Sequence, residues 1–232
     1  MSLFTSLSLF FPVYNEVAVL EDTIRRANRS LLGLKVADFE LIIIDDGSTD
    51  GSGALADKLA AELPVVRVVH HAANGGYGAA LQTGFGAATK EWVMYTDSDG
   101  QFDVADLANF ERYVGSYDVM LGYRLQRQDH VGRIVNAKAW SALVHLLIGV
   151  KVRDLDCAFK VIRRSALVRV LPLEASGAVI SAELLLKLKR AGYKFVQVGV
   201  HHYPRVAGEP SGAKPSVILK ALKELAALRR SV

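Results

Sequence analysis

The first half of the chain alternates strand-like and helix-like segments, and this alternation limits the fold more than any other feature. The run at 39–44 is apolar almost throughout, as in a strand buried on both faces. We predict strands at 7–13, 39–44, 65–69 and 92–96, and helices at 16–32, 51–63 and 75–89. This order is typical of a mostly parallel sheet with helices on both faces, so the expected class is α/β.

The second half is less regular. It is predicted to hold strands at 117–121, 158–162 and 195–200, helices at 135–148, 181–191 and 217–230, and a polar loop at 201–215. Hydrophobic residues make up 51% of the 232 residues, which is enough for a large core. No linker composition interrupts the chain, and we interpret residues 1–232 as a single domain.

The chain carries a net charge of +4 and one cysteine. A mildly basic chain suits phosphate-bearing ligands or an anionic membrane surface. Cys157 lies among apolar residues and is interpreted as a small buried hydrophobe, and a single cysteine fits a reducing compartment. No uninterrupted run of about 18 apolar residues occurs, so no transmembrane helix is expected.

Polar clusters come at or shortly after the ends of three predicted strands. They are Asp45-Asp46-Gly47-Ser48, Asn74-Gly75-Gly76-Tyr77-Gly78 and Asp97-Ser98-Asp99-Gly100. In open α/β sheets, ligands bind beyond the carboxyl ends of the strands. We therefore expect the three clusters to form one site.

Asp97 and Asp99 flank a single residue directly after a predicted buried strand. Two carboxylates at this spacing can face one divalent cation, and Mg²⁺ and Mn²⁺ prefer such oxygen ligands. A cation there would neutralise the charge that develops on a departing diphosphate. The alternative is a loop with a helix cap, and we assign Asp103 to capping.

The other two clusters indicate a nucleotide. A carboxylate at a strand end, such as Asp45 or Asp46, can accept hydrogen bonds from a nucleobase or a ribose, whereas a turn at Gly47 and a helix cap explain the residues that follow. Gly76 and Gly78 allow a ligand close to the backbone at a helix N-terminus, which favours anions. Their spacing matches neither a Walker loop nor a dinucleotide fingerprint.

Together these segments resemble the inverting glycosyltransferases of family two, which have the GT-A fold. The resemblance covers residues 7–125 and is carried by Phe11-Pro12-Val13-Tyr14-Asn15-Glu16, Ile44-Asp45-Asp46-Gly47-Ser48-Thr49-Asp50, the glycine turn, and Asp97-Ser98-Asp99-Gly100-Gln101. It implies that residues 1–125 bind a nucleotide sugar, with Ser98 among the contacts. The nucleoside pocket would be lined by Pro12, Tyr14, Glu16 and Asp45, and Mg²⁺ or Mn²⁺ would be held by Asp97, Asp99 and Gln101.

Residues 126–232 and the strand before them are similar to the polyprenyl-phosphate sugar synthases of the dolichyl-phosphate mannose synthase type. The similarity rests on Gly122-Tyr123-Arg124, Arg133, Arg153-Asp154-Leu155-Asp156-Cys157-Ala158-Phe159-Lys160 and His202-Tyr203-Pro204-Arg205. It implies transfer of a hexose from UDP-glucose or GDP-mannose to a lipid phosphate. The Gln/Arg-x-x-Arg-Trp motif of processive polysaccharide synthases is absent from the sequence.

A lipid phosphate is already anionic near neutral pH, so it needs cationic positioning groups more than a general base. Arg124, Arg133 and Arg205 are the candidates, because a guanidinium can bind phosphate oxygens in a bidentate way. Lys214 lies in the same polar loop as Arg205.

The role of two nearby carboxylates stays open. Asp154 or Asp156 can orient the acceptor arginines, act as a base, or pair with Arg153 or Lys160. A base is needed if the acceptor is a hydroxyl group, which is the second reading of the function. A third reading is a non-catalytic nucleotide-binding protein.

A lipid acceptor also requires contact with a bilayer. The predicted helices at 135–148 and 217–230 are rich in apolar residues, the second with basic ones, which suits interfacial helices; packing on the sheet is the alternative. The expected partners are a nucleotide sugar, a lipid phosphate and the cytoplasmic face of a membrane. Nucleic acid is not expected, and homo-oligomerisation is left open.

Overall fold

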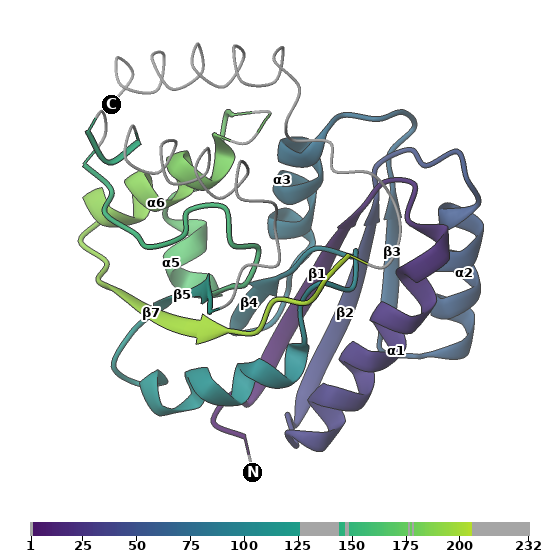
Figure 1. The fold of residues 1–232 in the computed structure, drawn as a ribbon, viewed down its shortest axis with the longest axis horizontal. Helices are drawn as coiled ribbons and strands as arrows, with labels where there is room; N and C mark the ends of the chain where they lie inside the picture. The colour runs from purple at the N-terminus through teal and green to yellow at the C-terminus, as the bar shows by residue number, and fades with distance from the viewer. Residues whose placement is uncertain (1, 126–143, 147–148, 176, 178, 206–232) are drawn as a thin grey trace.

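The structure, a computed structural model, describes residues 2–125, 144–146, 149–175, 177 and 179–205 (Figure 1). In its first half the elements are β1 (Ser6–Val13), α1 (Val17–Gly33), β2 (Asp38–Asp45), α2 (Ser52–Glu62), β3 (Val66–His70), α3 (Tyr77–Ala87) and β4 (Trp92–Tyr95). The predicted alternation of strands and helices is confirmed, with boundaries shifted by one or two residues in most elements.

The described part of the second half adds a 3₁₀ segment and further elements. They are η1 (Val104–Tyr113), β5 (Val119–Arg124), β6 (Lys160–Arg163), α5 (Arg164–Val168), α6 (Ile180–Arg190) and β7 (Phe195–Val200). Most of the predicted helix at 135–148 and all of the one at 217–230 lie outside the described residues. Within the described part, no helix is both long and apolar enough to cross a bilayer.

The described strands form one seven-stranded sheet in the order β3-β2-β1-β4-β6-β5-β7. The pairs β2–β3, β1–β2, β1–β4 and β5–β7 are parallel. Only β6 runs against its neighbours, β4 and β5, among the described strands. The predicted mostly parallel α/β sheet is therefore confirmed, and the carboxyl ends of β1, β2, β3 and β4 meet at one edge.

Helices cover both faces of the sheet, and β1 shows this directly because successive side chains of a strand point to opposite faces. Phe10 packs edge-on against Phe85 of α3 at a ring-centroid distance of 5.2 Å. Phe11, the next residue, lies instead against Thr23 and Ala27 of α1. Helices α1 and α3 thus lie on opposite sides of the sheet (Figure 1).

The close contact between α3 and β1 depends on a glycine. A Cβ atom at Gly84 would lie 2.2 Å from Phe10 Cδ2, far inside van der Waals contact. Gly86, one half-turn further along the same helix, has no atom within 4 Å of such a Cβ. A substitution at Gly84 therefore tests packing against β1, whereas the same substitution at Gly86 tests helix propensity alone.

We predict opposite effects for alanine at these two positions. Gly84→Ala should destabilise the protein by about 1–3 kcal/mol because it overpacks the sheet–helix contact. Gly86→Ala should stabilise it by up to about 0.5–1 kcal/mol because alanine is the better helix former. Urea denaturation of the two variants and the wild type measures both values, and equal effects at the two positions would contradict this description of the core.

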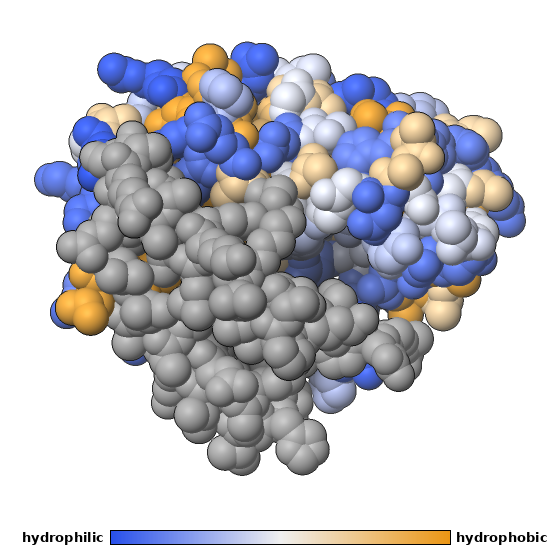
Figure 2. Space-filling model, turned by 90° about the horizontal axis from the view of Figure 1, so that it is seen from above, coloured by the Kyte–Doolittle hydropathy of each residue, from blue (hydrophilic) through white to orange (hydrophobic). Residues whose placement is uncertain are grey.

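The end of the molecule seen from above in Figure 2 is mainly hydrophilic in its described part, with apolar residues scattered singly and in small groups. Exposed large apolar side chains near the strand ends include Tyr14 and Tyr77. Apart from residues 144–146, the predicted membrane-contacting segments lie outside the described residues, so that expectation stays a prediction.

Candidate active site

The carboxyl ends of β1, β2, β3 and β4 carry the polar clusters expected from the sequence, and the parallel register brings them together. Gly47 makes the contact between two of them. It has a positive φ of 71°, and a Cβ there would lie 2.6 Å from the backbone carbon of Ala73. The Asp45-Asp46 turn and the glycine turn are therefore packed directly against each other.

Asp46 holds the glycine turn in place. Its carboxylate accepts hydrogen bonds from the amides of Gly75 at 2.9 Å and Gly76 at 2.8 Å, and lies 2.6 Å from His71 Nδ1. This changes the interpretation of the turn, because the anion at the start of α3 is the protein's own carboxylate. The amides of Gly75 and Gly76 are thus already used, whereas Gly78 lies buried in the first turn of α3 and its expected contact with a ligand stays a prediction.

Asp45 is fixed in a similar way. Its carboxylate accepts a hydrogen bond from the Ser48 amide at 3.0 Å and lies 2.8 Å from His70 Nδ1. Burial alone would raise the pKa of Asp45, but the hydrogen bonds from Ser48 and His70 outweigh it and lower the pKa below its usual value. Asp45 is therefore ionised and held in one orientation.

The two histidines at the end of β3 are the residues that the sequence reasoning missed. His70 pairs in register with Asp45 across the parallel β2–β3 ladder, and His71 follows it beside Asp46. The signal was present in the sequence as two consecutive acidic residues and two consecutive histidines at the ends of neighbouring predicted strands. Reading it required the register, which the sequence does not state.

His70 lies between two carboxylates, because its Nε2 is 3.0 Å from Asp57 on α2. Asp57 first, and Asp45 second, raise the pKa of His70 above its usual value. The charged ring then stabilises the folded state fully below the ordinary imidazole pKa of about 6.5, and this contribution is lost as pH rises through the raised pKa.

We predict that Asp57→Asn lowers the pKa of His70, measured by NMR titration of its ring protons. The variant should also lose more stability at about pH 5 than at about pH 8, because only the charged ring gains from Asp57. Asp38→Asn is the control. It also removes one carboxylate charge, but at the start of β2, far along the strand from Asp45, and it should leave the His70 titration unchanged. An unaltered His70 pKa in Asp57→Asn would refute the pairing.

Asp50 ties the first two helices to this edge. Its carboxylate accepts hydrogen bonds from the Ser52 amide at 2.9 Å and from the Val17 amide at 3.0 Å. The N-cap of α2 is Gly51 and not Asp50 as predicted, but the Asp50 carboxylate still satisfies the amide of Ser52, the first helical residue. One carboxylate positions the starts of both α1 and α2.

The loop after β4 carries the two aspartates of the expected cation site. Asp97 Oδ1 accepts a hydrogen bond from the Tyr77 hydroxyl at 3.1 Å. Burial and the neighbouring Asp99 carboxylate raise the pKa of Asp97 to about 7. Ser98, which lies between the two aspartates, donates to the Pro12 carbonyl at 3.0 Å. This bond links the loop after β4 to β1.

Asp99 is almost fully buried, and both of its oxygens have partners. Oδ1 accepts a hydrogen bond from the Gln101 amide at 3.1 Å, and Oδ2 accepts one from Arg205 Nη2 at 2.7 Å. Arg205 Nη1 also donates to Glu16 at 3.2 Å. Burial raises the pKa of Glu16, and Asp99 adds to this although Arg205 opposes it.

A divalent cation fits this donor set. Asp97 and Asp99 are hard oxygen ligands whose mutual repulsion a cation would relieve, and Mg²⁺ or Mn²⁺ commonly takes its remaining ligands from phosphate and water. Among the described residues, no group of three or more acidic, histidine or cysteine side chains could hold a metal ion. The expected third ligand, Gln101, donates its Nε2 to the Tyr203 carbonyl at 3.0 Å.

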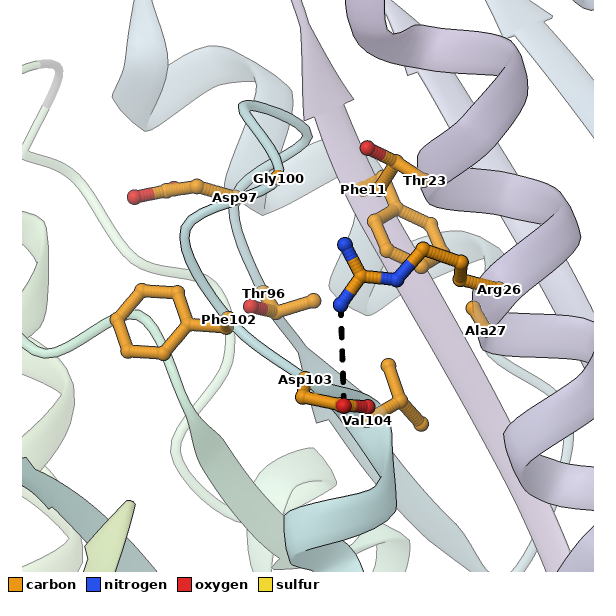
Figure 3. A pocket seen from close by; sticks show the side chains of 10 residues that line it. All are labelled: Phe11, Thr23, Arg26, Ala27, Thr96, Asp97, Gly100, Phe102, Asp103 and Val104. Carbon is orange, nitrogen blue, oxygen red and sulfur yellow. Dashed lines mark ion pairs between the residues drawn. The ribbon is translucent and has the colours of Figure 1, made fainter. Parts of the chain in front are cut away.

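A small pocket between α1 and the loop after β4 lies behind this pair (Figure 3). Arg26 reaches across it toward Asp103 at 3.7 Å, and the Asp97 side chain points away from them. Asp103 accepts a hydrogen bond from the Ala105 amide at 2.9 Å, which confirms its assignment as a cap, here of η1. The Arg26–Asp103 pair thus helps to hold the loop against α1. The Asp97 carboxylate lies on the opposite side of the loop from this pair (Figure 3).

The acceptor half contributes Arg124 at the end of β5. Its Nε and Nη2 each donate to Asp154 at 2.7 Å in a bidentate pair, with both side chains 8% exposed. Burial would lower the pKa of Arg124, but the Asp154 hydrogen bonds raise it above its usual value. Burial and Asp99 raise the pKa of Asp97, and the positive charges of Lys160 and Arg124 only partly oppose this rise.

This pairing decides one of the alternatives left open for Asp154. Its partner is Arg124, whereas the Arg153 guanidinium lies 4.3 Å from the Tyr123 ring centroid. Lys160 is buried and donates to the carbonyls of Leu155 and Cys157 at 3.0 and 2.7 Å.

Asp156, in contrast to Asp154, is exposed. The buried Cys157 thiol has a pKa raised to about 12, mainly by burial, which agrees with its interpretation as a small hydrophobe.

Of the remaining expected residues, the structure describes some and not others. Tyr14 is 47% exposed, and its place in a nucleoside pocket stays a prediction. Arg133 and Lys214 lie outside the described residues, so their roles stay predictions.

Residues 8–171 match the family model described as Glycosyl transferase family 2. The chain therefore belongs to glycosyl transferase family 2. It is 32% identical over 208 residues to the glycosyltransferase AglD of Haloferax volcanii, covering 86% of this chain and 33% of AglD. The family resemblance predicted from the motifs is confirmed.

Two further relatives are named for lipid phosphates. The undecaprenyl-phosphate 4-deoxy-4-formamido-L-arabinose transferase of Pseudomonas aeruginosa is 35% identical over 68% of this chain and 47% of its own length. The undecaprenyl-phosphate mannosyltransferase of Micrococcus luteus is 26% identical over 85% of this chain and 84% of its own length. The chain thus spans half or less of the length of the first two relatives.

Solved structures share the fold. Glucosyl-3-phosphoglycerate synthase from Mycobacterium tuberculosis, in complex with UDP, superimposes with a TM-score of 0.70 over 97% of this chain and 80% of that one, at 21% identity. Another structure of that enzyme contains Mn²⁺ together with UDP. The predicted GT-A fold is confirmed by this likeness.

Proposed function

We propose that this chain transfers a hexose from a nucleotide sugar, UDP-glucose or GDP-mannose, to a polyprenyl phosphate, with inversion at the anomeric carbon. One observation carries the proposal. The Asp97–Asp99 pair lies in the loop after β4, and at the end of β5 the Arg124 guanidinium is held in a bidentate pair with Asp154. Such a site has carboxylates for a cation on one side and a fixed positive charge on the other.

The donor would lie over the strand ends. Asp45, held ionised by Ser48 and His70, is suited to accept hydrogen bonds from a nucleobase, with Tyr14 and Glu16 completing the pocket. Asp97 and Asp99 would hold Mg²⁺ or Mn²⁺ against the diphosphate. When bound, this cation would neutralise the charge on the leaving nucleoside diphosphate. The Mn²⁺ and UDP present in a structure of the same fold support this donor site.

The acceptor chemistry favours a phosphate. A phosphate monoester is anionic near neutral pH, so its oxygen can attack the anomeric carbon while the bond to the diphosphate breaks, without a general base. What the reaction requires is cations that bring two anions together, and Asp154 orients Arg124 for this task. Arg133, Arg205 and Lys214 are proposed to serve the same end. Two relatives named for undecaprenyl phosphate support this acceptor class.

A hydroxyl acceptor is the competing function, and it would need a carboxylate base. Asp154 forms a bidentate pair with Arg124. Asp156, in the same loop, is the other candidate for the base. Because a lipid phosphate lies in a bilayer, our proposal also places the protein at the cytoplasmic face of a membrane.

We predict that purified protein with Mn²⁺ or Mg²⁺ releases nucleoside diphosphate from UDP-glucose or GDP-mannose only when a short polyprenyl phosphate is present. Asp99→Asn should lower this release by about 10²-fold or more, since it removes charge from the proposed cation site. Asp103→Asn, a change of the same kind at the η1 cap, should leave turnover nearly unchanged.

Release that depends on a sugar or other hydroxyl acceptor instead would favour the competing function, with Asp156→Asn then inactive. Nucleotide binding without turnover of any donor would leave a non-catalytic binding protein. Full activity of Asp99→Asn, or in the presence of EDTA, would refute the cation site.

A further inference from the structure

Arg205 lies between two carboxylates of the proposed donor site. Its Nη2 donates to Asp99 at 2.7 Å and its Nη1 donates to Glu16 at 3.2 Å. The Asp99 side chain is only 6% exposed, whereas that of Arg205 is 25% exposed. The guanidinium is therefore the direct positive partner of a nearly buried negative charge, and it reaches that charge from the solvent side.

The backbone that carries Arg205 is anchored independently of this ion pair. Asp106 accepts a hydrogen bond from the His201 amide at 2.6 Å and lies 2.9 Å from His201 Nδ1. The Tyr203 amide donates to the Gln101 carbonyl at 2.9 Å, and Gln101 Nε2 donates back to the Tyr203 carbonyl at 3.0 Å. These bonds hold the chain up to Tyr203 against the loop after β4. The long Arg205 side chain can thus leave Asp99 by rotating about its own bonds.

Asp99 cannot serve Arg205 and a divalent cation equally well. Its Oδ1 accepts a hydrogen bond from the Gln101 amide of its own loop, and its Oδ2 accepts one from Arg205. A divalent cation at that oxygen would also repel a guanidinium within a few ångströms. Whichever cation holds Oδ2 weakens the binding of the other.

We propose that Arg205 competes with the divalent cation for Asp99, and that its release couples cation binding to binding of the donor diphosphate. This inference rests on the proposed function, since it assumes that the donor's diphosphate lies beside Asp97 and Asp99. A displaced guanidinium keeps Glu16 as one partner and gains a phosphate oxygen as the other. Without a nucleotide the second partner is missing, so the cation binds at a cost that the nucleotide removes.

The coupling is reciprocal by thermodynamic linkage. A nucleoside diphosphate should strengthen cation binding by more than its own contribution as a ligand, because it also accepts the displaced guanidinium. Replacing Arg205 by an uncharged side chain of similar size should remove the competition. Cation binding in the absence of nucleotide should then become tighter, although the diphosphate loses a contact.

The test is a titration of Mn²⁺, followed by the EPR signal of the free ion, with and without UDP or GDP. The variants are Arg205→Gln and Arg26→Gln. Arg26 is the matched control, because it lies against the same loop at 3.7 Å from Asp103, and its ion pairs within the described residues are with Asp22 and Asp103. Thermal unfolding of both variants checks that the fold is retained.

We expect Arg205→Gln to bind Mn²⁺ about ten-fold more tightly than the wild type without nucleotide, and to show a smaller gain on adding UDP or GDP. Arg26→Gln should behave as the wild type within about two-fold. Unchanged or weaker Mn²⁺ binding by Arg205→Gln would overturn the inference, and so would an equal gain in Arg26→Gln, which would indicate a long-range charge effect.

Different results would contradict the Arg205 competition and the proposed function. Lipid-dependent turnover by the wild type, with no change of Mn²⁺ affinity in Arg205→Gln, would contradict only the proposal that Arg205 competes with the cation. Absence of Mn²⁺ binding by the wild type with either nucleotide would contradict the cation site of the proposed function and the inference together.

Discussion

The arrangement of this site follows from the cost of burying a carboxylate. Removing an ionised group from water is expensive unless hydrogen bonds or an opposite charge compensate for it. Most buried aspartates described at the strand ends have such compensation. Asp45 has Ser48 and His70, and Asp46 has two glycine amides and His71. Apart from the Asp45–Ser48 bond, which lies within one turn, these contacts join segments that are distant in the sequence, so the compensation also builds the site.

The same cost separates framework from function. Asp46, Asp50 and Asp154 use their oxygens on the protein itself, and their role is to position the glycine turn, the first two helices and Arg124. Asp97 is different, because a tyrosine hydroxyl and the nearby positive charges do not prevent its pKa from rising to about 7. A carboxylate left in that condition beside a second one is the natural place for a cation. Asp99 combines both properties. Its charge is compensated by Arg205, and we propose that this arginine can be displaced by a cation.

Much of this could be predicted from the sequence. The apolar run at 39–44 and the order of elements around it gave the α/β class and the parallel sheet, because periodicity and connection rules are local. The position of Asp45, Asp97 and Asp99 at strand ends followed from the same pattern. Pairings across the sheet could not be derived, because they depend on register. His70 and His71 were missed for this reason, and the partner of Asp154 could not be chosen among the nearby cations.

The functions of the glycine turn and Gln101 show a second limit. Glycines before a helix are typical of anion sites, but here the anion is Asp46, and composition does not reveal which anion occupies a helix N-terminus. Gln101 was expected as a cation ligand. Its side-chain nitrogen donates to the Tyr203 carbonyl, which positions the amide, and its role as a ligand stays a prediction.

The most direct test of the account is the position of Mn²⁺ in crystals grown with UDP or GDP, located by its anomalous scattering. The account predicts one Mn²⁺ within about 2.2 Å of carboxylate oxygens of both Asp97 and Asp99, in contact with the diphosphate at the carboxyl ends of the strands. A Mn²⁺ ion bound elsewhere, or a nucleotide bound away from this edge of the sheet, would contradict it.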